Sequence, residues 1–275
     1  MPESFIVDKN TLRSPQILAP FLTADPGNRV VLTDFCCMES YKGLAEYNLP
    51  SSIRILEQFA KQVVILRGTR EIAKLSLGSP WSAQQFVDEA QTSEFAEFCQ
   101  HVRLAVGGDP LLRKQLDAYA HEANRYLLDV QSEAAGIGPA ILMIAEKLPQ
   151  DTAKRLRRGQ DPTPDDIDVF IAGMLVLARD FYLAHPDFGA LPAAELIPQS
   201  FMLRYAVAGY LLAIDWIRRG GIESASASKL GNDIADMNYV AMATYFDGIL
   251  TKDTKLASIY ADARWYICDV LAAQP

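Results

Sequence analysis

Short apolar runs alternate with helical patterns near both ends of the chain. The runs at 5–7, 30–32, 62–68 and 248–251 are rich in valine, isoleucine, leucine or phenylalanine and have the length of strands. Helical patterns separate them at 11–22, from about 35, at 51–62 and at about 232–246, and a final one covers 255–272. This alternation predicts an α/β fold in which helices flank a parallel sheet.

The middle of the chain has a different pattern. It consists of long helical segments broken by glycine and proline, at 82–105, 110–131, 138–148, 164–184 and 198–219. Segments 170–184 and 205–217 are apolar nearly all round, which predicts helices buried in a core. We therefore predict a discontinuous α/β domain made of 1–78 and 226–275, and an all-helical insertion at 79–225.

Composition narrows the class of protein. Half of the 275 residues are hydrophobic and 22% are charged, and no apolar run approaches the roughly 20 residues that cross a bilayer. The four cysteines lack paired CxxC spacing, and no leader-like segment precedes the first strand, so we expect a reduced, cytoplasmic protein without structural zinc. The net charge of −8 argues against a chain that coats long nucleic acid, but it does not exclude a nuclease whose carboxylates bind cations.

Carboxylates follow the apolar runs. Asp8, Glu39 and Asp253 come shortly after three of them, and Asp236 opens the helix that leads into the last one. Side chains beyond the carboxyl ends of neighbouring parallel strands converge on one crevice. Oxygen ligands of this kind suit Mg²⁺ or Mn²⁺, and two such ions support phosphodiester hydrolysis. The pattern indicates a metal-dependent nuclease, although a single Asp after a strand is more often a turn or helix cap.

Three segments together resemble the PIN-like family of metal-dependent ribonucleases. FIVDKNTL resembles its opening strand with D-x-N, VVLTDFCCMES its second strand and glutamate-bearing helix, and DMNYVAMATYFDGILTKD its closing helix and strand with T-x-D. The resemblance covers about 1–75 and 226–275. It implies an acidic quartet that binds Mg²⁺ or Mn²⁺, supported by Asn10 and Thr251; the quartet is Asp8, Glu39, Asp236 and Asp253. The chain departs from the family at Lys9, where a small hydroxyl residue is usual.

The resemblance implies an endoribonuclease. Such an enzyme could be a toxin or defence effector that acts on structured RNA such as tRNA. It makes a homodimer plausible, and the helical insertion could bind a protein that restrains the nuclease. Asp233 and Asp247 compete with Asp236 for its role, and Arg67 and Arg70, after the third strand, are the preferred phosphate contacts.

Two alternatives stay open. One is a catalytically silent PIN-like scaffold that binds a protein partner. The other is a Mg²⁺-dependent phosphohydrolase on a related sheet. A phosphoaspartate enzyme would carry D-x-D after the first strand, whereas here Asp8 is followed by Lys9 and Asn10.

Overall fold

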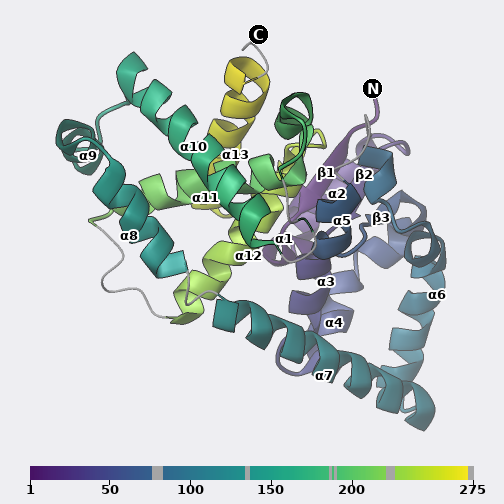
Figure 1. The fold of residues 1–275 in the computed structure, drawn as a ribbon. Coiled ribbons are helices and arrows are strands. Elements are labelled where there is room, and N and C mark those ends of the chain that lie inside the picture. The colour runs from purple at the N-terminus through teal and green to yellow at the C-terminus, as the bar shows by residue number, and fades with distance from the viewer. Residues whose placement is uncertain (76–82, 134–136, 186–187, 189–190, 221–226, 272–275) are drawn as a thin grey trace. The chain divides into compact units, whose positions relative to one another are not determined.

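The protein has a four-stranded parallel sheet and many helices (Figure 1). This computed structural model describes residues 1–75, 83–133, 137–185, 188, 191–220 and 227–271. The strand order is β3-β2-β1-β4, and all three neighbouring pairs are parallel. The strands are β1 (Ser4–Val7), β2 (Arg29–Leu32), β3 (Val63–Ile65) and β4 (Gly248–Leu250). The predicted α/β class, with a parallel sheet flanked by helices, is confirmed.

The two central strands explain why these short segments form a sheet. Ile6, Val7, Val30 and Val31 are fully buried, and parallel strands covered on both faces read as continuous apolar runs. The register pairs Phe5 with both Val30 of β2 and Gly248 of β4. The first and last strands of the chain are therefore neighbours, and the carboxyl ends of all four strands lie along one edge of the sheet.

The chain divides into two compact units. The first contains Met1–Ile72, Trp81–Asp129 and Tyr245–Ala257, and the second contains Ala73–Pro80, Val130–Thr244 and Ser258–Pro275. The predicted domain boundaries, 78/79 and 225/226, lie outside the described residues, so the division into 1–78 plus 226–275 and 79–225 stays a prediction.

The helices of the first unit connect the strands and cover the sheet. The helices are α1 (Lys9–Leu12), α2 (Pro15–Ala24), α3 (Asp34–Tyr41), α4 (Ala45–Ile53), α5 (Thr69–Leu75), α6 (Glu89–Val106) and α7 (Pro110–Glu133), of which α5 and α7 extend into the second unit. Helices α3 and α7 begin within one residue of the predicted positions, near 35 and at 110, whereas α2 and α6 begin later than predicted and residues 51–62 do not form one helix. The helix before them runs through Pro50, because burial of Leu49 and Ile53 outweighs the cost of an internal proline. A 3₁₀ turn follows at Leu56–Gln62.

The second unit is helical within its described residues. Its helices are α8 (Ile137–Lys147), α9 (Gln150–Arg157), α10 (Pro164–Ala184), α11 (Phe201–Arg218) and α12 (Ala227–Ala243), and it shares α13 (Thr254–Trp265) with the first unit. The prediction did not include α9, and it placed the end of the last helix at 272, whereas α13 ends at Trp265. Helix α12 begins five residues before the predicted start at about 232 and ends at Ala243, three residues before the predicted end at about 246.

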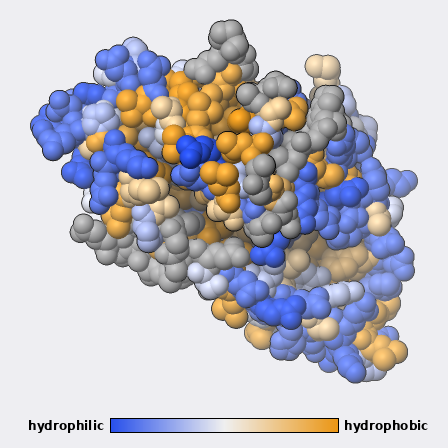
Figure 2. Space-filling model, in the orientation of Figure 1, coloured by the Kyte–Doolittle hydropathy of each residue, from blue (hydrophilic) through white to orange (hydrophobic). Residues whose placement is uncertain are grey.

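Helix α11 is the centre of the second unit. It is buried on nearly all sides, as predicted. Gly173 of α10 lets the Tyr210 ring of α11 approach closely, since a Cβ at Gly173 would lie 2.4 Å from that ring. Burial nearly all round was also predicted for residues 170–184 of α10. That prediction is wrong, because Leu175, Val176 and Leu183 are exposed. Hydrophobic surface accordingly gathers over α10 in Figure 2.

Candidate functional site at the carboxyl edge of the sheet

Asp8 follows β1 directly and is 4% exposed. It begins α1 as its N-cap, and Oδ1 accepts hydrogen bonds from the backbone N–H groups of Asn10 (2.5 Å) and Thr11 (3.1 Å). The other oxygen, Oδ2, accepts from the hydroxyls of Thr251 and, at 3.5 Å, Thr11. All of these donors are neutral. The carboxylate is therefore held in place by four hydrogen bonds from neutral dipoles.

Thr251 connects Asp8 to the end of β4. The Asp8 N–H donates to the Leu250 carbonyl at 3.3 Å, which extends the β1–β4 pairing to the strand ends. While Thr251 Oγ1 donates to Asp8, it accepts from the Asp253 N–H at 3.0 Å. Three of the residues chosen from the sequence, Asp8, Thr251 and Asp253, thus belong to one hydrogen-bonded network across the two neighbouring strands.

Asp253 combines a cap with an exposed carboxylate. Its Oδ1 accepts from the N–H groups of Lys255 (2.8 Å) and Leu256 (3.1 Å) at the start of α13. The residue is exposed, so its carboxylate lies at the surface of the sheet edge. Both Asp8 and Asp253 therefore cap the next helix, which is the common structural role of an aspartate that follows a strand.

Glu39 lies in α3, which packs against α1. Its charge acts on Lys9, the residue after Asp8. Burial lowers the pKa of Lys9, and the negative charge of Glu39 opposes that shift. Glu39 is thus close enough to the start of α1 to interact with a cation there. Lys9, the departure from the family pattern, is the cation nearest in sequence to the proposed site.

Asp34 is the feature of this edge that the sequence did not single out. It opens α3 after β2, and it accepts hydrogen bonds from the Thr69 N–H and hydroxyl (both 2.8 Å), the Phe35 N–H (2.9 Å) and the Tyr126 hydroxyl (3.2 Å). Burial raises its pKa above the usual range, against the lowering effect of these bonds. The available signal was positional, since Asp34 follows β2 almost as Asp8 follows β1.

The remaining polar candidates of the first unit are exposed. Asn10 contributes its backbone N–H to Asp8. Arg67 and Arg70 lie just beyond β3, and the Arg67 Nε donates to the Val87 carbonyl at 3.2 Å. Because β3 is two strands from β1, these arginines lie at a strand end about 10 Å from that of β1.

Three acidic candidates have other surroundings. Asp236 lies in α12, in the second unit, so its membership of the site stays a prediction. Asp233, also in α12, is 2% exposed and accepts a hydrogen bond from the Trp216 indole N–H at 2.8 Å, which gives it a structural role. Asp247 precedes β4 and exchanges hydrogen bonds with Ser4 at the start of β1. It therefore lies at the opposite edge of the sheet from Asp8.

The donor set at the carboxyl edge fits a hard divalent cation. Within the residues that the structure describes, no three His, Cys, Asp or Glu side chains form a group that could hold a metal ion. Mg²⁺ does not require such a cage, since it keeps several waters and binds through one or two carboxylates together with substrate phosphates. Asp8 and Asp253 can supply those carboxylates, with Glu39 acting through water.

The protein is thus an α/β protein with a four-stranded parallel sheet and many helices. Comparisons with protein-family models, with curated proteins and with solved structures each find no match for this chain. None of the helices in the described ranges is long and apolar enough to span a membrane.

Proposed function

We propose that the protein is a PIN-like endoribonuclease that depends on Mg²⁺ or Mn²⁺ and hydrolyses phosphodiester bonds. The observation that carries the proposal is the network that joins Asp8, Thr251 and Asp253 across β1 and β4. It gathers two carboxylates at the edge where open parallel sheets bind ligands. Their hydrogen-bond donors are neutral, so a bound cation would supply positive charge that these bonds do not provide.

The chain's own residues have distinct roles in this proposal. Asp8 is the fixed ligand, because four hydrogen bonds from neutral donors hold its carboxylate in one orientation. Asp253 is the exposed ligand that faces substrate, and Glu39 holds an attacking water. Arg67 and Arg70 bind a neighbouring phosphate of the RNA. A divalent cation at this edge would lower the pKa of a bound water and offset charge on the phosphoryl oxygens.

Asp236 is the proposed fourth acid and comes from α12. A compact, structured RNA such as tRNA suits an acidic protein with a local cation site better than a long, evenly charged strand does, because few phosphates need to be neutralised. A toxin or defence effector, a protein regulator bound to the helical part and a homodimer remain proposals that follow from the family resemblance.

The decisive experiment is a cleavage assay on labelled tRNA, single-stranded RNA and single-stranded DNA with EDTA, Mg²⁺ or Mn²⁺. We expect metal-dependent RNA cleavage that falls by about 100-fold or more in Asp8→Asn and Asp253→Asn. Asp247→Asn is the matched control, since it changes an exposed aspartate at the opposite edge of the same sheet. Cleavage that persists in EDTA or in Asp8→Asn would contradict the proposal, and Asp236→Asn tests the fourth acid separately.

A second function is a catalytically silent scaffold of the same fold that binds a protein. One observation favours it: backbone N–H groups already occupy the Oδ1 atoms of both Asp8 and Asp253, so each carboxylate has a structural role without metal. This reading predicts no cleavage and no heat of Mn²⁺ binding in calorimetry. A small aryl phosphate ester in the same assay tests the remaining alternative, because a phosphohydrolase would turn it over and a nuclease would not.

A further inference from the structure

A cavity of about 440 Å³ lies in the first unit between the sheet and helices α3, α4, α6 and α7. Most of its lining is apolar, and its deep end is formed by side chains of less than 10% exposure, namely Cys36, Leu49, Ile53, Leu56, Ile65 and Phe95. A volume of this size falls in the range of small-molecule sites, roughly 300–1,000 Å³. The cavity is separate from the network around Asp8, because neither Asp8 nor Thr251 lines it.

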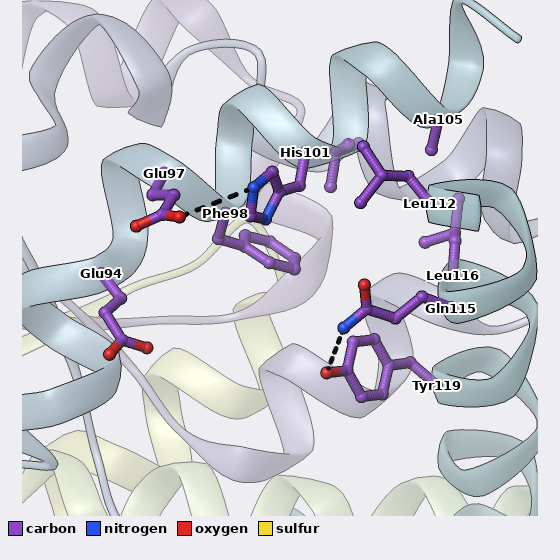
Figure 3. Close-up of a pocket in the computed structure, with 10 residues that line it drawn as sticks. Glu94, Glu97, Phe98, His101, Ala105, Leu112, Gln115, Leu116 and Tyr119 are labelled. Atoms are coloured by element: carbon purple, nitrogen blue, oxygen red, sulfur yellow. Dashed lines mark hydrogen bonds and ion pairs between the residues drawn. The ribbon is translucent and has the colours of Figure 1, made fainter. Parts of the chain in front are cut away.

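The cavity continues into a second hollow of about 350 Å³ between α6 and α7. Glu94, Phe98 and Tyr119 line both parts and so mark the passage between them. Figure 3 shows residues of the two helices on either side of this hollow, with Phe98 and His101 across from Gln115 and Tyr119. The two parts adjoin at Glu94, Phe98 and Tyr119, and together they are called the route.

The charge of the route has one sign. Glu94, Glu97 and Glu122 line it, whereas no lysine or arginine is among the described lining residues of either part. His101, 3.6 Å from Glu97, is the only basic side chain among them. All three glutamates are exposed and lie at the outer part, so the negative charge gathers where the route opens.

The thiol of Cys37 and the phenol of Tyr41, which also line the cavity, are uncharged at neutral pH. Burial raises the pKa of Cys37 to about 12, with a smaller contribution from Asp34. Burial also raises the pKa of Tyr41 above its usual value. Both groups remain protonated and offer only weak or neutral hydrogen bonding. An apolar chamber behind an acidic opening selects a ligand with an apolar body and a positive end.

We propose that this two-part cavity, lined by α3, α4, α6 and α7, is a binding site for a small organic cation. The ligand class is an aromatic or branched aliphatic body that carries one ammonium or guanidinium group. The body occupies the chamber around Ile53 and Phe95, and the cation lies between Glu94 and Glu122. This site is independent of the nuclease proposal, because it uses other residues of the first unit.

The test is calorimetric titration of the full chain with three matched probes: 2-(2-naphthyl)ethylamine, 2-(2-naphthyl)ethanol and 2-naphthylacetate. We expect one amine bound per chain, about fivefold more tightly than the alcohol, since exposed carboxylates contribute up to about 1 kcal/mol each. The carboxylate probe should bind most weakly. Absence of amine binding at millimolar concentration, or equal affinity for all three probes, would overturn the proposal.

Two kinds of variant locate the site. Ile53→Phe fills the deep end and should abolish binding of both the amine and the alcohol, while Glu94→Gln with Glu122→Gln should reduce only the preference for the amine. Glu46→Gln is the control, because Glu46 is exposed on α4 of the same unit and lines neither part. The glutamate variants decide the question if Ile53→Phe does not fold.

One competing occupant is a second copy of the chain. Sedimentation of the free protein tests this, because a dimer that closes the cavity would be lost in Ile53→Phe and would exclude the amine. That result would overturn the small-molecule assignment.

Discussion

Asp34 in the first unit and Asp166 in the second are the same residue type near the start of a helix, but their environments differ in one respect. Asp166 is 2% exposed, and Arg155 donates to both of its oxygens, at 2.5 and 3.0 Å. Asp34 accepts four hydrogen bonds, and all of them come from neutral donors.

The pKa values of the two carboxyl groups shift in opposite directions. Burial raises the pKa of both. At Asp166, however, hydrogen bonds from Arg155, Thr152 and Thr163 outweigh burial and hold the pKa well below its usual range. At Asp34 burial dominates and the pKa is raised. A guanidinium completes the structural site of the second unit, whereas the hydrogen-bond donors to Asp34 are all neutral.

The largest loss of stability should come from breaking the ion pair between Asp166 and Arg155. Asp166→Ala removes the acceptor for Arg155, Thr152 and Thr163, so the buried Thr152 hydroxyl loses the oxygen to which it donates. We expect the free energy of unfolding of the second unit to fall by about 2 kcal/mol, measured by urea titration. Asp165→Ala, at the exposed neighbouring position of the same helix turn, should change it by less than about 0.5 kcal/mol. Equal effects would show that the Arg155 pair contributes little.

The next effect concerns the divalent cation that the proposed function places at the sheet edge. Mn²⁺ at ten times its dissociation constant should raise the free energy of unfolding by about 1.4 kcal/mol, because it binds only the folded chain. Thermal unfolding with and without Mn²⁺ measures this. The stabilisation should disappear in Asp8→Asn and persist in Asp166→Asn. Stabilisation that persists in Asp8→Asn would place the cation elsewhere.

A smaller effect is expected when one neutral donor is removed from the edge. Thr251→Val keeps the shape of the side chain but removes the hydroxyl that donates to Asp8 and accepts from the Asp253 N–H. The expected loss is about 1 kcal/mol in urea unfolding. Thr23→Val is the control, since the Thr23 hydroxyl is exposed and donates within its own helix. A loss no greater than that of the control would mean that Thr251 does not hold Asp8.

The final contrast is in how the contributions of Asp34 and Asp166 to the free energy of unfolding change with pH. The raised pKa of Asp34 means that its contribution to stability is present below the usual value near 3.8 and is lost as pH rises through the raised value. The lowered pKa of Asp166 means that its contribution is present above 3.8 and is lost as pH falls through the lowered value.

Unfolding measured from pH 3 to 7 separates the two carboxyl groups. Relative to wild type, Asp34→Asn should gain stability as pH rises above about 4, whereas the deficit of Asp166→Asn should shrink below about 4. Parallel curves for the two variants would remove the distinction.

The sheet could be predicted from the sequence because each strand is a short apolar run closed by a polar residue. Val30 and Val31 read as β2, and α3 begins at Asp34, one residue from its predicted start near 35. Helix ends were less predictable where tertiary burial decides them. Pro50 lies inside α4, and α12 both begins and ends earlier than predicted, for reasons of packing that no local pattern contains.

The candidate site was predictable only in part. Its strand-end residues, Asp8, Thr251 and Asp253, follow from topology, since neighbouring parallel strands bring their ends together. Asp34 was missed because its partners, Thr69 and Tyr126, are 35 and 92 residues away. Asp247 is near Asp253 in sequence yet lies at the other edge of the sheet, because the short strand β4 separates them.

The pairing of β1 with β4 also has a consequence for the timing of synthesis. Asp8 and the Thr251 hydroxyl that holds it are 243 residues apart. At roughly 5–20 residues per second, a ribosome needs about 12–50 s to add the second after the first. During that interval β1 is an edge strand without its last partner, and the network around Asp8 is incomplete. The arrangement delays formation of the candidate site until nearly all of this sequence has been translated.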